Sequence, residues 1–497
     1  MRRRTIVLVA AALALGACAG KPLRITCSGF ADQLEPLPPS AVVRDIATDQ
    51  DWQGKKTEVL GLSDDDLVAY MVERLRSEKS WLRPQFEYMV QRGQLQVEAG
   101  ARSTSRQIPD WSQEPILMLS GGGQWGAFGA SYLKEVHTKT PGGLPDFGVV
   151  TGVSTGAMQS LFFGNWRDPE DRQQALERMY GAYKIADERE IVERGGLGAF
   201  ATKGAMAQLG PLHQRIIDRI CPPRDKKCPY VEAFLTKVSG APRQPKHVLV
   251  GLVEATSGQF KYVSLNALVN HQYSYGNEEE KPHRAGQCLA GAVLASSAMP
   301  GYYQQLQVGD EKSGYRTYID GGARASVFHV LIARAFSPAV MTQTMQQAYP
   351  AMLAQEASSS EPEATRPIYV VRNGPTSVVT LKPTKPSVAP GPAVKSDPAW
   401  TGLSAIQRAY AIMVNQSEVN SIAAIRLLQP KGDLFLATAD GYATYKDGTV
   451  RCEKSNEEAM FDPAFMKCLF QLGKDKTTIV REDGSPWISV SEVDSGK

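Results

Sequence analysis

The sequence predicts an α/β fold built on a mainly parallel central sheet, and two observations lead to that expectation. From about residue 112 onward, short apolar runs of strand length alternate with stretches of helical periodicity. Strands that alternate with helices favour a parallel sheet with helices on both faces. Apolar residues make up 42% of the 497 residues and charged residues 22%, which allows a large packed core and argues against disorder.

Five apolar runs are the expected strands of this sheet, and helical stretches lie between them. The runs cover residues 115–119, 147–151, 248–253, 315–319 and 368–371. A long helix is expected near residues 403–428, because apolar side chains recur there at helical spacing. The residues on that apolar face are Ala405, Ile406, Ala409, Tyr410 and Met413.

The N-terminus has the pattern of an export signal. Arg2–Arg4 form a positive segment, and the apolar run Ile6–Leu15 that follows is too short to span a bilayer. The next residues, Leu15-Gly16-Ala17-Cys18, resemble the bacterial lipobox, which predicts a signal peptide over residues 1–17 and a lipid on Cys18. Ordinary secretory cleavage that leaves Cys18 free is the alternative.

A lipoprotein of this kind would belong to the bacterial cell envelope. Several acyl chains on one residue anchor a protein stably, whereas one chain binds only marginally. The lipoprotein resemblance links retention in the inner membrane to Asp after the lipidated cysteine, and Ala19 stands there instead. The outer membrane is therefore favoured, with the protein facing the periplasm or the exterior.

The charge balance excludes a general affinity for nucleic acid. The formal net charge is +3, but Arg2–Arg4 lie in the predicted signal peptide, and 52 basic residues then face 52 acidic ones. A neutral chain without a basic stripe offers no field for a phosphate backbone.

Six cysteines remain after Cys18, and an even number in an exported protein permits disulfides. Spacing favours Cys221–Cys228 and Cys452–Cys468, and it leaves Cys27 and Cys288 undecided. No CxxC is present, and no histidine stands at finger spacing from a cysteine pair, so no metal site is expected.

The motif Gly152-Val153-Ser154-Thr155-Gly156 predicts a nucleophile elbow. A GxSxG between a strand and a helix forms a turn too tight for side chains at the glycines, and it exposes the serine hydroxyl. The run at 147–151 supplies the strand before it, and Ala157–Leu161 supplies the start of the helix after it.

A second glycine-rich turn, Gly121-Gly122-Gly123-Gln124-Trp125-Gly126, also follows a strand and opens a helix. Backbone N–H groups in such a loop can bind a phosphate or stabilise an oxyanion. The loop also satisfies GxGxxG, but a dinucleotide site needs an acidic residue about 20 residues on, where Thr138–Gly143 has none.

A third motif, Asp320-Gly321-Gly322, directly follows the expected strand at 315–319. Because ligands bind at the carboxyl ends of strands in open α/β sheets, a carboxylate in this position is well placed at the rim of a site. A plain Asp-Gly turn is the alternative.

The order of the three motifs resembles the patatin-like phospholipase family. Ala295-Ser296-Ser297-Ala298-Met299-Pro300, about twenty residues before Asp320, is similar to the segment that this family carries before its DGG strand. The resemblance covers roughly residues 115–330, and more loosely the helix near 403–428.

The resemblance implies a three-layer α/β/α fold and a Ser–Asp dyad that works without histidine. Ser154 would be the nucleophile and Asp320 its base, with an oxyanion hole formed by the N–H groups of Gly121, Gly122 and Gly123. Partial burial is expected to raise the pKa of Asp320, since a carboxylate near its reference value is a weak base.

The activity that the resemblance implies is hydrolysis of acyl esters, with membrane phospholipids or lysophospholipids as substrates, through an acyl-enzyme and without a cofactor. The chain is expected to divide into four segments. They are the signal peptide at 1–17, a tether and helical extension at 18–111, the catalytic domain at 112–439 and a small C-terminal extension at 440–497. The tether is expected because its first part is mixed in composition and rich in proline, as in Glu35-Pro36-Leu37-Pro38-Pro39. In the C-terminal extension, Asp462-Pro463 is expected to begin a helix.

Two departures from the family pattern bear on substrate preference. Trp125 stands where the family usually has a basic residue. Ala323-Arg324-Ala325-Ser326 follow the DGG motif, where the family often has Asn and Pro.

Two other functions remain open from the sequence. An α/β-hydrolase triad would use the order Ser154, Asp320 and His329, although His329 follows Asp320 by only nine residues and lies in an apolar run. A non-catalytic lipoprotein that keeps the fold for binding is the other. The helix-rich residues 167–240 could form a lid over the acyl chain or a plain helical insertion.

Overall fold

The computed structural model describes the chain in several stretches. They are residues 21–36, 64–76, 114–166, 168–195, 205–224, 227–235, 237–238, 241–242, 246–328, 340, 343–344, 347–348, 367–377, 402–428, 433–445, 447–456, 459–479 and 485–490. No helix in these stretches is long and apolar enough to cross a membrane.

An 11-stranded sheet forms the centre of the molecule. Across it, in order, lie β1 (Leu23–Thr26), β11 (Leu306–Asp310), β12 (Gly314–Asp320), β9 (His247–Glu254), β4 (Val149–Val153), β3 (Ile116–Leu119), β13 (Ile368–Arg372), β14 (Leu434–Thr438) and β15 (Ile488–Ser489). Two more strands, β10 (Phe260–Ser264) and β2 (Leu34–Pro36), attach beside β9. Two small hairpins lie outside this sheet, β5 (Glu193–Arg194) with β6 (Ala207–Gln208) and β7 (Lys237–Val238) with β8 (Ala241–Pro242).

The five predicted strands are confirmed as β3, β4, β9, β12 and β13. The pairs β9–β4, β4–β3, β3–β13 and β13–β14 are parallel, so the sheet is mainly parallel at its centre, as predicted. β3, β4 and β9 are buried along their whole length, because helices cover both faces of the sheet. β4 begins two residues later than predicted and runs to Val153, so Gly152 lies inside the strand.

Helices pack on one face of the sheet and form a large apolar core with it. This side contains α6 (Gly126–Lys139), α7 (Thr155–Ser160), α8 (Pro169–Tyr183), α10 (Gly210–Ile220), α11 (Pro229–Glu232), α12 (Leu265–Tyr273), α13 (Lys281–Ser297) and α17 (Pro463–Lys476). Short 3₁₀ turns connect them at η1 (Phe30–Gln33), η3 (Gly123–Trp125), η4 (Leu161–Asn165), η5 (Glu188–Glu190) and η6 (Gly321–Ala323). The predicted start of α17 is confirmed, since the Asp462 carboxylate accepts hydrogen bonds from the N–H groups of Ala464 and Phe465.

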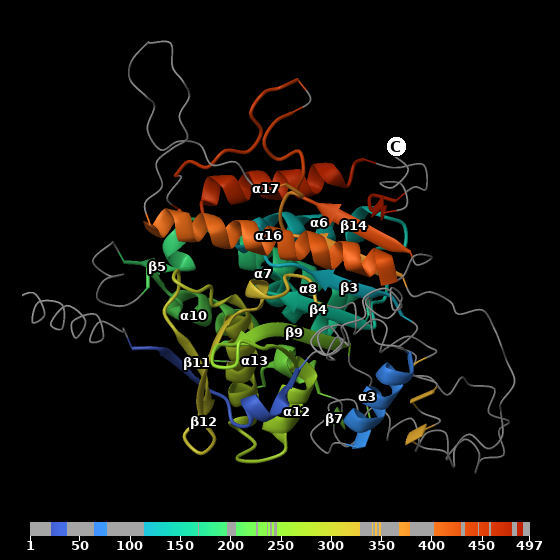
Figure 1. Ribbon diagram of the computed structural model, residues 1–497, viewed down its shortest axis with the longest axis vertical. Coiled ribbons are helices and arrows are strands. Elements are labelled where there is room, and N and C mark those ends of the chain that lie inside the picture. Colours follow the sequence, from blue (N-terminus) through green and yellow to red (C-terminus); the bar gives the residue numbers. More distant parts are fainter. Residues whose placement is uncertain are drawn as a thin grey trace, which may run out of the picture.

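A second apolar core covers the opposite face. It contains Val68, Met71 and neighbouring residues of α3 (Asp64–Arg76), together with Ile425 of α16 (Gly402–Leu428). The three layers predicted for the fold are therefore present, and Figure 1 shows the long orange α16 crossing the molecule near β3.

The N-terminal segment differs from the expected tether. Leu23–Thr26 pair in parallel with β11 at the edge of the sheet, although the two strands are far apart in the sequence (Figure 1). Ile25 is buried and Cys27 forms a disulfide with Cys288 of α13. Proline-rich composition suggested a linker, but the alternation in the short run before Cys27 fits an edge strand with one buried face.

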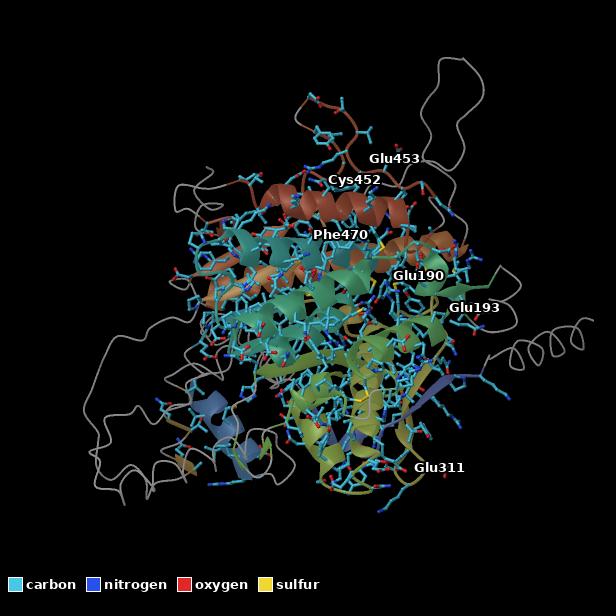
Figure 2. The ribbon with its side chains drawn as sticks, turned by 180° about the vertical axis from the view of Figure 1, so that it is seen from behind. Glu190, Glu193, Glu311, Cys452, Glu453 and Phe470 are labelled. Carbon is cyan, nitrogen blue, oxygen red and sulfur yellow. A yellow bond between two sulfur atoms is a disulfide. The ribbon has the colours of Figure 1, made fainter. Side chains whose placement is uncertain are left out.

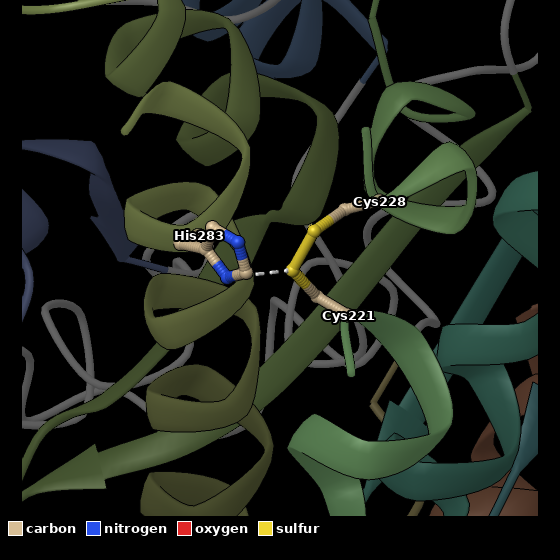
Figure 3. A group of neighbouring side chains, drawn as sticks. All are labelled: Cys221, Cys228 and His283. Carbon is tan, nitrogen blue, oxygen red and sulfur yellow. Dashed lines mark hydrogen bonds between the residues drawn. A yellow bond between two sulfur atoms is a disulfide. The ribbon is translucent and has the colours of Figure 1, made fainter. Parts of the chain in front are cut away.

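The structure confirms the two predicted disulfides and adds Cys27–Cys288. Cys452, labelled in Figure 2, bonds to Cys468 within α17. Cys221 and Cys228 join the end of α10 to the start of α11, and Nδ1 of His283 lies 3.2 Å from Sγ of Cys221 (Figure 3). Because the two sulfurs are bonded to each other, neither is available as a thiolate ligand for a metal.

The described part of the helix-rich region at 167–240 is built into the main core. Leu176 and Met179 of α8 and Ile216 and Ile220 of α10 are buried in it. Asp168 caps α8 by accepting a hydrogen bond from the N–H of Asp171. These helices therefore pack as an insertion in the fold.

Candidate active site

Ser154 lies on a sharp turn between β4 and α7. Its backbone has φ 54° and ψ −122°, a region that residues with a side chain rarely adopt. A Cβ on Gly152 would collide with the carbonyl of Gly156, and a Cβ on Gly156 would collide with the carbonyl of Leu119. Both glycines of the motif are therefore needed for the turn, as the elbow prediction requires.

A buried serine holds the strained turn in place. The N–H of Ser154 donates to Oγ of Ser296 at 2.8 Å, and the Ser296 hydroxyl donates to the carbonyl of Gly251 at 2.5 Å. Ser296 is fully buried near the end of α13 and Gly251 lies in β9. The elbow is thus tied to the neighbouring strand through one hydroxyl group.

Asp320 reaches the elbow on a strand that runs against its neighbours. β12 is antiparallel to β9, with Asp320 opposite Leu252, while β4 is parallel to β9, with Val153 opposite Gly251. The carboxyl end of β12 therefore stops beside the carboxyl end of β4. The sequence predicted Asp320 at the carboxyl end of a strand and gave that strand no direction. The strand is antiparallel to β9, and it ends at the level of the elbow because it approaches from beyond the rim.

The Ser154 side chain lies beside the Asp320 carboxylate and, as a hydrogen-bond donor, favours its ionised form. Asp320 is 6% exposed, and its Oδ1 also accepts the N–H of Gly322 at 2.7 Å. Burial raises the pKa of Asp320 to about 6, against the opposing effect of these two hydrogen bonds. The expected rise is confirmed in direction, and the carboxylate is both ionised at neutral pH and more basic than an exposed one.

The glycine-rich loop lies directly beside the elbow. A Cβ on Gly121 would approach Cβ of Ser154 to 3.4 Å, and Gly122 and Gly123 have φ of 144° and 56°. Gly122 has no room for a side chain, because its Cβ would collide with the carbonyl of Asn373. Gly123 faces open space. Glycine is thus required at two of the three positions for conformation or close approach.

The three N–H groups of this loop are not equivalent. The N–H of Gly121 donates to Oγ of Ser326 at 3.2 Å. For the N–H groups of Gly122 and Gly123, no acceptor is found among the residues that the structure describes. The prediction treated the three as equal oxyanion donors, and in the structure one of them already has a partner.

A buried polar network supports the loop from behind, and the motifs gave no sign of it. The N–H and side-chain amide of Asn373 donate to Oγ and the carbonyl of Ser120, and the Asn373 and Gln159 side chains exchange two hydrogen bonds. Beside it, the guanidinium of Arg372 lies 3.2 Å from the carboxylate of Glu418 on α16, with both side chains buried. Burial raises the pKa of Glu418, although Arg372 and Ser120 oppose the rise.

The elbow and the loop are also linked directly. Oγ1 of Thr155 donates to the carbonyl of Gly123 at 2.9 Å, and the Tyr183 hydroxyl of α8 donates to the carbonyl of Thr155 at 2.7 Å. These contacts fix the spacing between the nucleophile and the loop.

Trp125, at the family's usual basic position, packs instead against the C-terminal segment. Its ring makes edge-to-face contacts with Tyr442 and Phe465, at centroid distances of 4.7 and 5.1 Å. Oε1 of the adjacent Gln124 accepts the N–H of Asp462. The residues after the glycine loop are therefore held by α17 rather than by a charge.

Two predicted residues, Cys18 and His329, lie outside the described residues. The neighbours that lower the pKa of Asp320 are Ser154 and Gly322, and none of the described histidines is among them.

Comparison with known protein families finds a similarity over part of the chain. Residues 117–215 match the family model of patatin-like phospholipases. This segment contains the glycine loop and Ser154 and ends before Asp320. A patatin-like phospholipase domain implies a lipid acyl hydrolase, and the α/β architecture described above agrees with it.

No curated protein matches the chain. The crystal structure of VipD from Legionella pneumophila aligns with 73% of this chain and 67% of its own, at 12% identity and a TM-score of 0.28.

Proposed function

We propose that this protein is a membrane-anchored serine hydrolase that cleaves acyl esters of phospholipids or lysophospholipids through a Ser154–Asp320 dyad. The observation that carries the proposal is the placement of the Ser154 side chain beside the buried carboxylate of Asp320, whose pKa burial raises to about 6. A serine hydroxyl becomes an effective nucleophile when a base within hydrogen-bond reach accepts its proton.

The first half-reaction forms an acyl-enzyme. Oγ of Ser154 attacks the ester carbonyl carbon as its proton passes to Asp320, and the carbonyl oxygen becomes an oxyanion. The N–H groups of Gly122 and Gly123 are the backbone donors available to it. When the tetrahedral intermediate collapses, the C–O bond to the leaving alcohol breaks, and that alcohol takes the proton from Asp320.

The second half-reaction repeats these steps with water as the nucleophile. Asp320 accepts a proton from water, the hydroxide adds to the acyl carbon, and Ser154 leaves with the proton returned by Asp320. The fatty acid is released and the enzyme regains its starting state. No redox or metal chemistry is required by these steps.

The proposed anchor is close in sequence to the first strand of the sheet. Cys18 precedes the first residue of β1 by five positions, which spans at most about 18 Å of extended chain. A lipid on Cys18 would therefore hold the folded body at the membrane surface, with its lipid substrates nearby. The lipobox and Ala19 are the grounds on which we propose the bacterial outer membrane as its location.

Activity-based labelling tests the catalytic proposal. Purified protein is treated with a fluorophosphonate probe, the labelled peptide is identified by mass spectrometry, and hydrolysis of glycerophospholipids, lysophospholipids and p-nitrophenyl esters is measured. We expect the label on Ser154, no label in Ser154→Ala, and fatty acid release from the lipids. A label on another residue, or none on the folded parent, would contradict the dyad.

Fractionation tests the anchor separately. We expect the parent to sediment with membranes and to carry acyl groups on Cys18, and Cys18→Ala to be released or misprocessed. If Cys18→Ala fractionates as the parent does, and the parent carries no acyl group, the anchoring proposal is wrong while the catalytic one stands.

A further inference from the structure

Ser326 lies beside the nucleophile and the glycine loop at once. It is fully buried, six residues after Asp320. A Cβ placed on Gly121 would be 3.1 Å from Oγ of Ser326 and 3.4 Å from Cβ of Ser154. The Ser326 hydroxyl and the nucleophile therefore face the same side of Gly121.

The hydrogen bond between Gly121 and Ser326 uses the only donor that the Gly121 backbone has. Its N–H points to Oγ of Ser326 at 3.2 Å, across 205 positions of sequence. A serine hydroxyl has one donor and two acceptor lone pairs. The bond from Gly121 takes one lone pair and leaves the O–H of Ser326 to donate elsewhere.

The O–H of Ser326 has no other partner within the part of the chain that the structure describes. A buried hydroxyl commonly has its hydrogen-bonding capacity used, because water cannot reach it. Its neighbours are the nucleophile and the loop where the oxyanion would develop. The N–H of Gly121 fixes the oxygen of Ser326 and, by polarising the hydroxyl, strengthens it as a donor.

We propose that the Ser326 hydroxyl is a donor of the oxyanion hole and takes the place of the Gly121 N–H, which it engages. This inference rests on the proposed function. When Ser154 attacks, the electron pair of the ester C=O moves onto oxygen, and Ser326 O–H donates to that oxyanion beside Gly122 and Gly123. Ser326 keeps its proton throughout, and the hydrogen bond weakens again when the C=O re-forms.

The role fits the departure after the DGG motif. Ser326 ends the stretch Ala323–Ser326 that replaces the family's usual residues, and Arg324 in the same stretch points elsewhere, to the carbonyl of Gly258. A small hydroxyl side chain at this position reaches the N–H of Gly121.

Inhibition by a trifluoromethyl ketone tests the proposal. Such a ketone adds reversibly to an active serine and forms a tetrahedral oxyanion, so its inhibition constant reports on the oxyanion hole. Full-length parent, Ser326→Ala and Ser326→Cys are compared, with Ser131→Ala as the matched control. Ser131 is an equally buried serine whose hydroxyl donates to the carbonyl of Phe470, outside the site.

For Ser326→Ala we expect kcat on a p-nitrophenyl ester to fall by about 30-fold or more, with KM within about twofold, because oxyanion donors act mainly in the transition state. The inhibition constant of the ketone should rise by a similar factor. Ser326→Cys should lie between Ser326→Ala and the parent, since a thiol is a weak donor. Ser131→Ala should match the parent in all three quantities.

Two results would overturn the proposal. One is a Ser326→Ala enzyme with kcat within twofold of the parent, which would mean that the freed N–H of Gly121 suffices. The other is a loss of kcat with ketone inhibition unchanged, which would make Ser326 a positioning residue that acts through Gly121. Fluorophosphonate labelling of Ser154 in the same samples separates these results from failure of the proposed function itself.

Discussion

The amide of Ser154 is held by the hydroxyl of Ser296 at 2.8 Å, and the same hydroxyl donates to Gly251 at 2.5 Å. Removing the hydroxyl would leave a buried N–H and a buried carbonyl without partners beside a strained turn. Ser296 is thus the side chain that connects the elbow to β9.

Ser296→Ala is expected to slow fluorophosphonate labelling of Ser154 by about tenfold, because small displacements of a nucleophile are costly. Ser297→Ala is the matched control, since its hydroxyl donates to Val293 on the same helix and not to the elbow. Equal labelling rates for the two variants, with both folded, would show that Ser296 does not position the nucleophile.

Asp320→Asn is expected to stabilise the protein at neutral pH while it abolishes activity. The pKa of Asp320 is raised to about 6 by burial, so the folded state binds the proton more tightly than the unfolded state. Ionisation of the buried Asp320 carboxylate costs the folded state stability. This cost is absent below the ordinary pKa near 4, where the carboxyl is protonated in both states, and it is complete above about pH 6. Thermal melting should therefore show a gain for Asp320→Asn at pH 8 that disappears near pH 4.

Asp462→Asn serves as the control for that measurement. The pKa of Asp462 is lowered, because hydrogen bonds from Phe465, Asn456 and others outweigh its burial. Its carboxylate therefore stabilises the fold above its ordinary pKa, and Asp462→Asn should lose stability at pH 8. A melting temperature for Asp320→Asn below the parent's at pH 8 would contradict the raised pKa.

The pH dependence of kcat/KM should show one acidic limb near pH 6. Asp320 must be ionised to accept the proton of Ser154, so activity falls as pH drops through its pKa. Assays of a p-nitrophenyl ester from pH 4.5 to 8 measure this limb. A limb near pH 4 would mean that Asp320 is not buried in solution. A histidine base near 6.5 would give a similar limb, and the His329→Gln variant separates the dyad from the triad.

The disulfide between Cys27 and Cys288 is expected to secure the edge of the sheet. It joins the residue after β1 to α13 across 261 positions, and loss of a disulfide typically costs about 2–5 kcal/mol. Cys27→Ser should lower the melting temperature by several degrees with little change in kcat. An unchanged melting temperature would show that β1 docks without the bond.

The proximity of Ser154 and Asp320 could be predicted from the sequence because the elbow and DGG motifs are local patterns tied to strand ends. Periodicity also located the central strands, since apolar runs bounded by breakers are distinctive. The direction of β12 could not be predicted, because local sequence does not encode pairing with β9. Composition likewise misled for β1, a short edge strand near proline-rich sequence.

The side chains that support the elbow and the glycine loop could not be predicted from the sequence, for a different reason. Ser296 and Ser326 are ordinary serines until the fold brings them to Ser154 and Gly121. Asn373 and Gln159 meet across 214 positions, and no spacing rule connects them. Ser296 lies in the segment Ala295–Pro300 that resembles the family, so the sequence did point to it. No motif pointed to Asn373.

The central claim is that Asp320 alone serves as the base for Ser154. The most direct measurement is kcat on a p-nitrophenyl ester for Asp320→Asn and His329→Gln, with thermal melts to confirm folding. We expect Asp320→Asn to lower kcat by on the order of a thousandfold or more and His329→Gln by less than about tenfold. A folded His329→Gln enzyme as inactive as Ser154→Ala would contradict the dyad and establish a histidine-dependent triad.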